Sequence, residues 1–286
     1  MTETTCIFPS PDEQAIYAYR WASDAATRRG TVHIAHGAGE HSGRYREVAA
    51  RLTAAGYTVY AHDHRGHGRS AAPGRLGDPG PSSWRRMIGD MVAILRHIRD
   101  VESPHPVILL GHGLGSWAAQ HLVLDHSHEL DALVLSGTAA LDLLPESVFD
   151  PAALNAAFAP ARTPYDWLTR DESRVDAYAA DPACGFTLPP AAVAEILRDA
   201  PRLADPAELS RVRPDLPVYV LAGDQDPLHP GLDPLLDRYR KAGLIHLTAA
   251  LYPGGRHEML HETNRDEVLT ALVTWLDRAV PRPAVP

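Results

Sequence analysis

The chain has 286 residues, of which 45% are hydrophobic and 22% are charged, and its formal net charge is −9. The negative charge argues against nucleic acid or an anionic membrane as an electrostatic partner. Two cysteines, Cys6 and Cys184, are too few and too far apart for a disulfide framework or a zinc site. No apolar run approaches the roughly 20 residues of a membrane span. One globular α/β core with an inserted subdomain fits this length and composition.

The first five residues carry neither a basic segment nor an apolar run of signal-peptide length. We therefore expect a cytoplasmic protein. Lys241 is the only lysine, whereas Ala, Arg and Pro are frequent, and this usage indicates a GC-rich bacterial genome.

Short apolar runs alternate with amphipathic stretches, which predicts a mostly parallel central sheet flanked by helices. The expected strands are rich in β-branched or bulky apolar residues and cover residues 16–21, 31–35, 58–62, 107–110, 132–136, 218–222 and 246–252. The first of these is expected to form an antiparallel edge. The expected helices have apolar residues at helical spacing and cover residues 43–55, 83–99, 116–125, 233–242 and 265–279.

The strand pattern stops between residues 141 and 213. This segment is rich in Ala, Pro, Asp and Leu, and it predicts short helices at residues 151–158, 174–180 and 190–198. We therefore expect an α/β core formed by residues 1–140 and 214–286, with residues 141–213 inserted as a helical cap. Lids of this kind gate access to active sites.

Residues 111–115, Gly-His-Gly-Leu-Gly, have the frame of G-x-S-x-G, in which the central serine is a nucleophile on a sharp strand-to-helix turn. An apolar run precedes them and a helix-like stretch follows, as the motif requires. Gly113 stands at the position of the serine. The segment therefore has the context of a serine hydrolase and lacks the nucleophile.

In a hydrolase of this type, the elbow is followed along the chain by an acid and then a base. Asp224 and Asp226 come directly after the strand expected at 218–222, and His257 follows a Gly-rich turn after the last expected strand. The base takes a proton from the nucleophile, and the acid holds its tautomer and stabilises the imidazolium. Asp226 is the preferred acid, which leaves Asp224 as a turn or capping residue.

Five motifs resemble, in their order and spacing, those of the monoacylglycerol lipases and the related bacterial lysophospholipase-like hydrolases. They are HGAGEHSGRY at residues 36–45, DHRGHGRS at 63–70, the elbow at 111–115, the G-x-x-D pattern that ends at Asp226, and Arg-His-Glu at 256–258. The resemblance covers nearly the whole chain and is loosest in the cap. It implies an α/β-hydrolase fold and hydrolysis of a carboxylic ester through an acyl-enzyme, with no cofactor and no metal.

The resemblance also implies roles for single residues. Asp226 is the acid, His257 is the base, and Gly113 occupies the position of the nucleophile. The backbone N–H groups of Ala38 and Leu114 form the oxyanion hole, which does not depend on the missing hydroxyl. The implied substrate is a small ester or lipid-like molecule: a monoacylglycerol or a similar mono-ester with one apolar arm. No nucleic acid and no integral membrane contact is implied, and the oligomeric state stays open.

Several residues have a second interpretation. His62, His64 and His67 could hold a metal, but the resemblance explains them without one. Ser116, one turn beyond Gly113, is interpreted as structural rather than as a displaced nucleophile. The aromatic residues of the cap either pack in its core or line an acyl pocket, and they are Phe149, Phe158, Tyr165, Trp167, Tyr178 and Phe186.

Three of these aromatic residues, Phe149, Phe158 and Trp167, are the candidates for substrate contact. The sequence alone does not separate pocket lining from core packing in the cap.

Two explanations of Gly113 stay open. An engineered Ser→Gly change would leave an otherwise native site, and the presence of every other motif favours it. Glycine also tolerates the strained backbone of the elbow. Alternatively, the chain is a natural variant that binds a ligand or uses His257 with a water. In either case we expect ester hydrolysis by this chain to be nearly absent.

Alternatives to hydrolysis of a monoacylglycerol also follow from the sequence. The chain could be a carboxylesterase for another small or aromatic mono-ester, or a non-catalytic ligand-binding protein on the hydrolase scaffold. A lyase or isomerase could use His257 and Asp226 as an acid–base pair. Restoring serine at position 113 separates these alternatives, because only the esterases would then hydrolyse esters.

Overall fold

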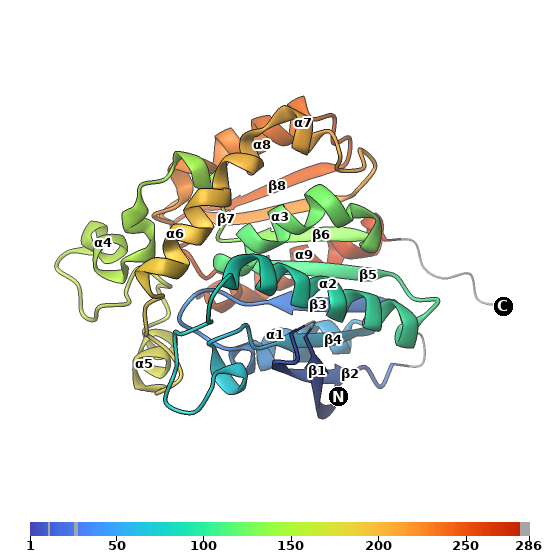
Figure 1. Ribbon diagram of the computed structural model, residues 1–286, viewed down its shortest axis with the longest axis horizontal. Coiled ribbons are helices and arrows are strands. Elements are labelled where there is room, and N and C mark those ends of the chain that lie inside the picture. Colours follow the sequence, from blue (N-terminus) through green and yellow to red (C-terminus); the bar gives the residue numbers. More distant parts are fainter. Residues whose placement is uncertain (11, 26–27, 281–286) are drawn as a thin grey trace.

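The computed structural model describes residues 1–10, 12–25 and 28–280. Within these ranges one eight-stranded sheet has the strand order β1-β2-β4-β3-β5-β6-β7-β8 (Figure 1). Strands β3 to β8 are parallel, whereas β2 pairs antiparallel with both β1 and β4. The bounds are β1 (Thr2–Pro9), β2 (Ala15–Ala22), β3 (Gly30–Ala35), β4 (Tyr57–His62), β5 (Val107–His112), β6 (Ala132–Ser136), β7 (Val218–Gly223) and β8 (Leu247–Tyr252).

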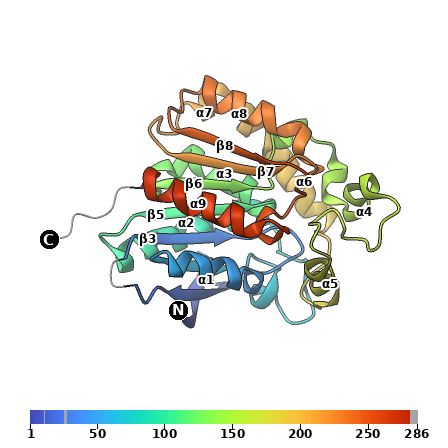
Figure 2. The same ribbon diagram turned by 180° about the vertical axis from the view of Figure 1, so that it is seen from behind.

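Helices cover both faces of the sheet. On one face lie α2 (Ser83–Glu102), α3 (Leu114–His126) and α8 (Leu232–Lys241), and on the other lie α1 (Arg46–Ala54) and α9 (Arg265–Ala279) (Figures 1 and 2). Every residue of β3, β4 and β5 is buried as a result. Strands covered on both faces have near-continuous apolar sequences, which explains the pattern seen in the chain. The predicted mostly parallel sheet flanked by helices is confirmed.

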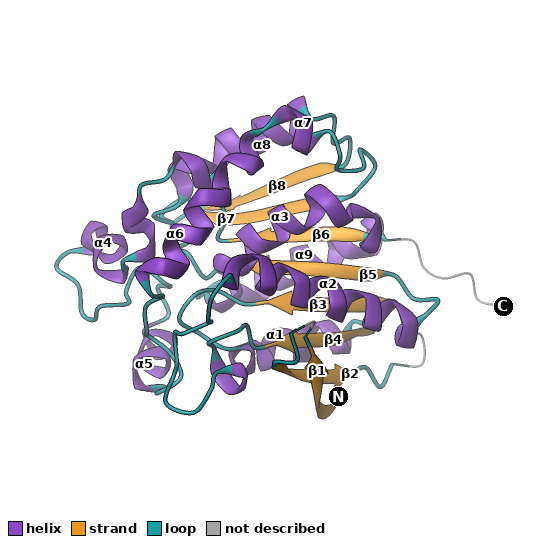
Figure 3. Ribbon diagram, viewed as in Figure 1, coloured by secondary structure: helices purple, strands orange, loops and turns teal. Residues whose placement is uncertain are grey.

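The segment between β6 and β7 contains helices and no strand among its described residues (Figure 3). These helices are α4 (Pro151–Asn155), α5 (Glu172–Ala180), α6 (Pro190–Asp199) and α7 (Pro206–Leu209). The first three lie beyond the carboxyl ends of the parallel strands, whereas α7 lies near α8 in both views (Figures 1 and 2).

The last part of this segment packs with the core. Leu203, Leu209 and Val212 belong to the same buried cluster as the apolar residues of α2 and α3. Leu154 of α4 and Ile196 of α6 belong to that cluster as well, so packing does not mark where the cap ends, and its boundary at residue 213 stays a prediction. Residues 11, 26–27 and 281–286 of the expected core lie outside the described residues.

The predicted edge of the sheet was wrong. We expected residues 16–21 to form an antiparallel edge strand, but β2 lies inside the sheet and β1 forms that edge. The residues Thr2–Thr5 at the start of β1 are polar and exposed, so this strand has no apolar alternation by which the sequence could identify it. None of the helices in the described ranges has the length and apolar character needed to cross a bilayer.

Candidate active site

The turn between β5 and α3 is a sharp strand-to-helix connection with Gly113 alone at its tip. The backbone there has φ 51° and ψ −117°, a conformation that glycine adopts without the strain that a side chain would bring. The flanking residues Gly111 and Gly115 must be glycines because a Cβ at either position would clash with the backbone. A Cβ on Gly111 would lie 2.5 Å from the carbonyl oxygen of Gly115, and a Cβ on Gly115 would lie 2.2 Å from that of Ala35.

His257 and Asp226 form a buried pair beside this turn, because they follow the neighbouring strands β8 and β7. Nδ1 of His257 lies 3.0 Å from Oδ2 and 3.1 Å from Oδ1 of Asp226. The backbone N–H of Leu228 donates to the same Oδ1 at 2.9 Å. Since an ionised carboxylate only accepts hydrogen bonds, we assign the ring proton to Nδ1, which leaves Nε2 with a lone pair.

This free nitrogen faces Gly113. A Cβ built on Gly113 would lie 3.3 Å from Nε2 of His257 and 3.4 Å from Cα of Gly37. A serine here would therefore hold its hydroxyl beside the base and close to the loop after β3. The arrangement matches a nucleophile–base–acid triad in which a hydrogen atom replaces the side chain of the nucleophile.

Burial and nearby negative charge shift the pKa of His257 in opposite directions. Burial alone would lower the pKa of the ring, but the carboxylate of Asp226 raises it through its charge and its hydrogen bond. Glu258 and Glu40 contribute smaller attractions, and the net effect is a pKa above 6.5. The ring of His112, whose centroid lies 4.7 Å away, has its pKa lowered to about 4 by burial and by His257. His112 is therefore neutral near pH 7.

Two backbone amides beside Gly113, those of Ala38 and Leu114, have no acceptor within the described part of the chain. The amide before Ala38 is occupied, because Gly37 donates to Oε1 of Glu40 at 2.6 Å. Two free amides beside the reacting position are what an oxyanion hole requires. The geometry is therefore compatible with the predicted role of Ala38 and Leu114.

A chain of buried histidines supports the loop that carries Ala38. Nε2 of His33 lies 2.8 Å from Nδ1 of His62, and Nε2 of His62 lies 2.9 Å from Nδ1 of His64. Nε2 of His64 lies 2.9 Å from the carbonyl oxygen of His36. A carbonyl only accepts, so Nε2 of the neutral His64 carries the proton and its Nδ1 accepts from His62. By the same step, His62 accepts through Nδ1 from Nε2 of His33, whose own Nδ1 has no partner among the described residues. The chain of bonds thus defines three neutral tautomers.

The same bonds bear on the metal interpretation of the histidines. Both ring nitrogens of His62 and of His64 are used within the chain, and Nδ1 of His67 donates to the carbonyl oxygen of Arg65 at 2.8 Å. Burial lowers the pKa of all three rings, that of His62 to about 3. The contacts explain these residues as supports of the loop and give no support to a metal role.

Two other groups of three side chains could each offer ligand atoms within 4.8 Å of one another: His41, Asp181 and Cys184, and Glu40, His112 and Glu258. In the first group, Nε2 of His41 lies 3.0 Å from Oδ2 of Asp181. In the second, Arg44 pairs with both carboxylates. These pairings account for both groups without an ion.

A cavity of about 70 Å³ opens over Gly113 and His257, beneath the cap. Its wall is mostly apolar and combines residues of the core with residues of the cap, among them Trp117, Val148, Phe149, Leu154, Trp167 and Leu188. An apolar cavity with a few convergent polar groups is the usual form of a small-molecule site.

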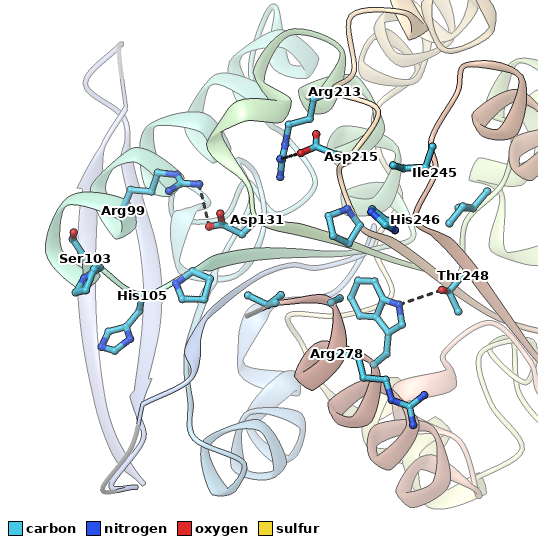
Figure 4. A pocket seen from close by; sticks show the side chains of 17 residues that line it. Arg99, Ser103, His105, Asp131, Arg213, Asp215, Ile245, His246, Thr248 and Arg278 are labelled. Carbon is cyan, nitrogen blue, oxygen red and sulfur yellow. Dashed lines mark hydrogen bonds and ion pairs between the residues drawn. The ribbon is translucent and has the colours of Figure 1, made fainter. Parts of the chain in front are cut away.

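A larger open hollow, of about 1090 Å³, lies at the opposite end of the sheet (Figure 4). Four of its charged side chains form two ion pairs, Arg99 with Asp131 at 3.1 Å and Arg213 with Asp215 at 3.1 Å, and Arg278 also lines it. It contains none of the predicted site residues. Because ligands of parallel α/β sheets bind at the carboxyl ends of the strands, the cavity over Gly113 is the candidate active site.

A family model described as "Serine aminopeptidase, S33" matches residues 26–264. The chain belongs to this family. The monoacylglycerol lipase of Mycolicibacterium smegmatis is 34% identical over 272 residues, which cover 90% of each chain. The monoglyceride lipase of Rattus norvegicus is 27% identical over 277 residues, covering 88% of this chain and 86% of the relative.

Among solved structures, the carboxyl esterase of Bacillus coagulans in complex with glycerol superposes with a TM-score of 0.87 and 26% identity, covering 98% of this chain and 100% of the esterase. The α/β-hydrolase fold and the resemblance to monoacylglycerol lipases are therefore confirmed. By family, the protein is a carboxylic ester hydrolase of the monoacylglycerol lipase and esterase type.

The three aromatic residues predicted to contact substrate in this hydrolase lie in different places. Phe149 and Trp167 line the cavity, and the ring of Trp167 lies 4.9 Å from that of His257. Phe158 is not among the lining residues. It lies in a short 3-10 turn, and its ring is 4.5 Å from the guanidinium of Arg256. The structure therefore does not support Phe158 as a substrate contact.

Sequence reasoning missed Trp117, which lines the cavity from α3 and packs on Phe149 with ring centroids 5.6 Å apart. Leu114 and Trp117 are three residues apart at the start of a helix and thus share one face. That spacing is the signal that could have identified Trp117.

The second interpretations of two residues agree with their contacts. Asp224 accepts a hydrogen bond from the backbone N–H of Gly254 at 2.7 Å, as a turn residue does. Oγ of Ser116 donates to the carbonyl oxygen of Gly113 at 2.6 Å and lies 2.8 Å from Oγ1 of Thr138. Ser116 is therefore turned into the core.

Arg44 joins the loop of His257 to the loop after β3. It donates to both carboxylate oxygens of Glu258, at 2.6 and 2.7 Å, and also to Glu40. Burial alone would raise the pKa of Glu40, but Arg44, His112 and the amide of Gly37 lower it to about 2. Glu258 directly follows His257, so this ion network holds His257 in place relative to the free amides of Ala38 and Leu114.

Replacing Arg44 with methionine should lower the free energy of unfolding by about 3–5 kcal/mol, because two buried carboxylates would lose their partner. Urea denaturation at pH 7.5 measures this loss. The control is Arg46→Met, which removes an exposed pair with Glu3 and should cost at most about 1 kcal/mol. Equal losses in the two variants would contradict the role given to Arg44.

Proposed function

We propose that the site binds a monoacylglycerol, or a similar mono-ester with one apolar arm, with the ester carbonyl over Gly113. The carbonyl oxygen would accept hydrogen bonds from the amides of Ala38 and Leu114, and the acyl arm would lie in the apolar cavity. The proposal rests on the arrangement of groups around position 113. The lone pair of His257, the two free amides and the apolar cavity all meet at position 113.

With serine at position 113, the same geometry would support acyl transfer. His257 would take the proton of the hydroxyl as its oxygen attacks the carbonyl carbon, and Asp226 would stabilise the imidazolium. The protonated His257 would then give its proton to the leaving alcohol, and a water would release the acyl group in a second, similar step.

The names of two similar proteins support this substrate class. The Mycolicibacterium smegmatis relative is a monoacylglycerol lipase, and the Bacillus coagulans esterase was solved in complex with glycerol. The test is turnover of a panel of monoacylglycerols and aryl esters by the Gly113→Ser variant. Activity on aryl esters alone would favour the carboxylesterase alternative. Absence of turnover across the panel would overturn the proposal in favour of a binding protein or of another reaction.

The cap should set the choice of acyl arm. The catalytic pair and the amides contact groups that all esters share, so discrimination must come from the cavity wall. In the Gly113→Ser background, Phe149→Ala removes a ring from that wall and should shift the relative kcat/KM toward longer acyl arms by about ten-fold, since one methylene is worth about 1–3 kcal/mol in such pockets.

The matched control for this prediction is Phe158→Ala, since both changes truncate a cap phenylalanine and only Phe149 lines the cavity. Turnover of esters with acyl chains of 2 to 18 carbons gives the profile. If both variants keep the parent profile, the core pocket rather than the cap sets specificity.

A further inference from the structure

The nitrogen of His257 that faces Gly113 has no hydrogen-bond partner among the described residues. The bond from Nδ1 to Asp226 fixes the orientation of the ring, so the lone pair on Nε2 keeps its direction. Gly113 places no side-chain atom between Nε2 and the cavity that both residues line. The base is thus in direct contact with the space that a ligand or a water molecule can enter.

The hydroxyl groups near the site do not replace the missing serine. Ser116 donates to the carbonyl oxygen of Gly113, and Oγ of Ser136 lies 3.2 Å from Nδ1 of His112. Neither cysteine lines the cavity, and the two glutamates near the base are paired with Arg44.

Two further hydroxyl groups line the cavity: that of Tyr178 donates to the carbonyl oxygen of Gly39 at 2.8 Å, and that of Thr187 makes no hydrogen bond to His257. Since no described hydroxyl or thiol is hydrogen-bonded to Nε2 of His257, we take a water molecule as the nucleophile.

The groups that stabilise a tetrahedral adduct are independent of the side chain at position 113. The amides of Ala38 and Leu114 belong to the backbone, and the elbow is joined to the loop after β3 because Gly115 donates to the carbonyl oxygen of His36 at 3.1 Å. Donors fixed in advance in this way stabilise developing negative charge without reorganisation.

From these three observations we infer that the chain, with glycine at position 113, hydrolyses carboxylic esters slowly by direct attack of a water molecule that His257 activates, without an acyl-enzyme. The inference rests on the proposed function for its substrate class, an ester with an apolar acyl arm.

The reaction balances with one ester and one water. The water oxygen forms a bond to the carbonyl carbon while its proton moves to Nε2 of His257, and the carbonyl electron pair moves onto the oxygen held by the two amides. The bond to the alcohol oxygen then breaks, the carbonyl re-forms, and the leaving oxygen takes the proton from Nε2. The products are one acid and one alcohol, and His257 returns to its neutral form.

This route is slow because a bound water is held less firmly than a serine hydroxyl that belongs to the protein. No covalent intermediate divides this reaction into two easier steps. Esters with a good leaving group should therefore be hydrolysed fastest by this route. The probe is therefore an aryl ester, 4-nitrophenyl butyrate.

The rate should also depend on pH in a defined direction, because only neutral His257 accepts the proton. The charged groups near the ring are Asp226, Glu258 and Glu40, and the neighbouring His112 is neutral. The rate should therefore fall as the pH drops through the pKa of His257, which Asp226 raises above its usual value.

The test compares four proteins with 4-nitrophenyl butyrate at pH 8. The parent chain should show turnover above the buffer rate that is linear from the first cycle. His257→Gln should reduce it at least ten-fold, whereas the matched control His128→Gln, at an exposed position, should not change it. Gly113→Ala should also reduce it at least ten-fold, since the methyl group would occupy the position 3.3 Å from Nε2 and displace the water.

Intact-protein mass spectrometry during turnover separates this route from an acyl-enzyme. The parent should carry no acyl adduct and should not react with a fluorophosphonate, whereas Gly113→Ser should do both. An adduct on the parent, an unchanged rate in His257→Gln, or an unchanged rate in Gly113→Ala would each overturn the inference. Thermal unfolding of each variant checks that a lost rate does not reflect a lost fold.

The parent and the Gly113→Ser variant together separate failure of this inference from failure of the proposed function. If Gly113→Ser hydrolyses esters and the parent does not exceed the buffer rate, the water route is wrong and the proposed function stands. If neither protein hydrolyses any ester, the proposed function falls and the inference falls with it.

Discussion

Replacing Gly113 with serine is expected to raise the turnover of mono-esters by on the order of 10³- to 10⁶-fold, since loss of the nucleophile in a serine protease costs about 10⁶ in kcat. The remaining parts of the site are in place. His257 is paired with Asp226, the amides of Ala38 and Leu114 are free, and a Cβ at position 113 would lie 3.3 Å from Nε2.

The serine should bring a cost in stability as well as a gain in rate. At φ 51° a residue with a Cβ is strained by about 1–2 kcal/mol relative to glycine. Measured by urea denaturation, Gly113→Ser and Gly113→Ala should lose similar amounts, because both add the same Cβ. Only the serine variant should gain activity.

The control for the rate is the double variant Gly113→Ser with His257→Gln, which should lose nearly all of the gain because an unactivated hydroxyl is a weak nucleophile. An active double variant would show that His257 is not the base. An inactive Gly113→Ser variant that still folds and binds an ester would show that the elbow does not present a working nucleophile.

The elbow could be predicted from the sequence because its constraints are local. Gly111 and Gly115 are glycines for steric reasons that depend on a turn of a few residues, and such a turn leaves a recognisable motif. The meeting of Asp226 and His257 beside the elbow could be predicted because each lies in the turn after a strand, and parallel strands bring their carboxyl ends to the same edge of the sheet.

The contacts that support the site could not be predicted in the same way, since they join segments far apart in the chain. Asp90 of α2 is buried and accepts a hydrogen bond at 2.8 Å from Arg65, which lies 25 residues earlier in the chain. Likewise, no spacing rule connects His33 on β3 with His62 on β4; their pairing depends on the register of two neighbouring strands.

The directions of the cap side chains also could not be predicted from the sequence. Phe149 and Phe158 are both cap phenylalanines with apolar neighbours, but the first faces the cavity and the second faces Arg256. The cap helices are short, and short helices carry too few residues for a periodic pattern to define an inner face.

Lowering the pH from 7.5 to 5 should unfold the protein or bring it close to unfolding. Eight buried histidines in the described ranges have their pKa lowered, chiefly by burial: His33, His36, His62, His64, His67, His112, His121 and His261. In the unfolded chain each takes up a proton near pH 6.5. Below that pH the unfolded state binds more protons than the folded state, so stability falls as the pH falls.

The size of this effect follows from linkage. Each histidine that stays neutral in the folded state costs about 1.4 kcal/mol per pH unit below its unfolded pKa. For the four rings whose pKa lies far below 6.5, those of His33, His36, His62 and His64, this is about 2 kcal/mol each at pH 5 and about 8 kcal/mol together, which is comparable with the whole stability of an ordinary domain, about 5–15 kcal/mol. His257 acts in the opposite direction, because its pKa is raised, but it is one group against these four.

Urea denaturation at pH 7.5, 6.5, 5.5 and 5 measures how steeply the free energy of unfolding falls with pH. One pair of variants then shows whether the buried histidines cause this slope. His33 begins the histidine chain, and its Nδ1 has no hydrogen-bond partner among the described residues. His33→Leu should therefore destabilise the protein at pH 7.5, because the hydrogen bond to His62 is lost. It should also reduce the pH slope of the free energy of unfolding by about 1.4 kcal/mol per pH unit, because one titrating group is lost. The exposed His128→Gln should change neither quantity. A stability that stays flat from pH 7.5 to 5 would mean that these rings take up protons in the folded protein, in which case the chain of neutral tautomers that holds the loop of Ala38 is wrong.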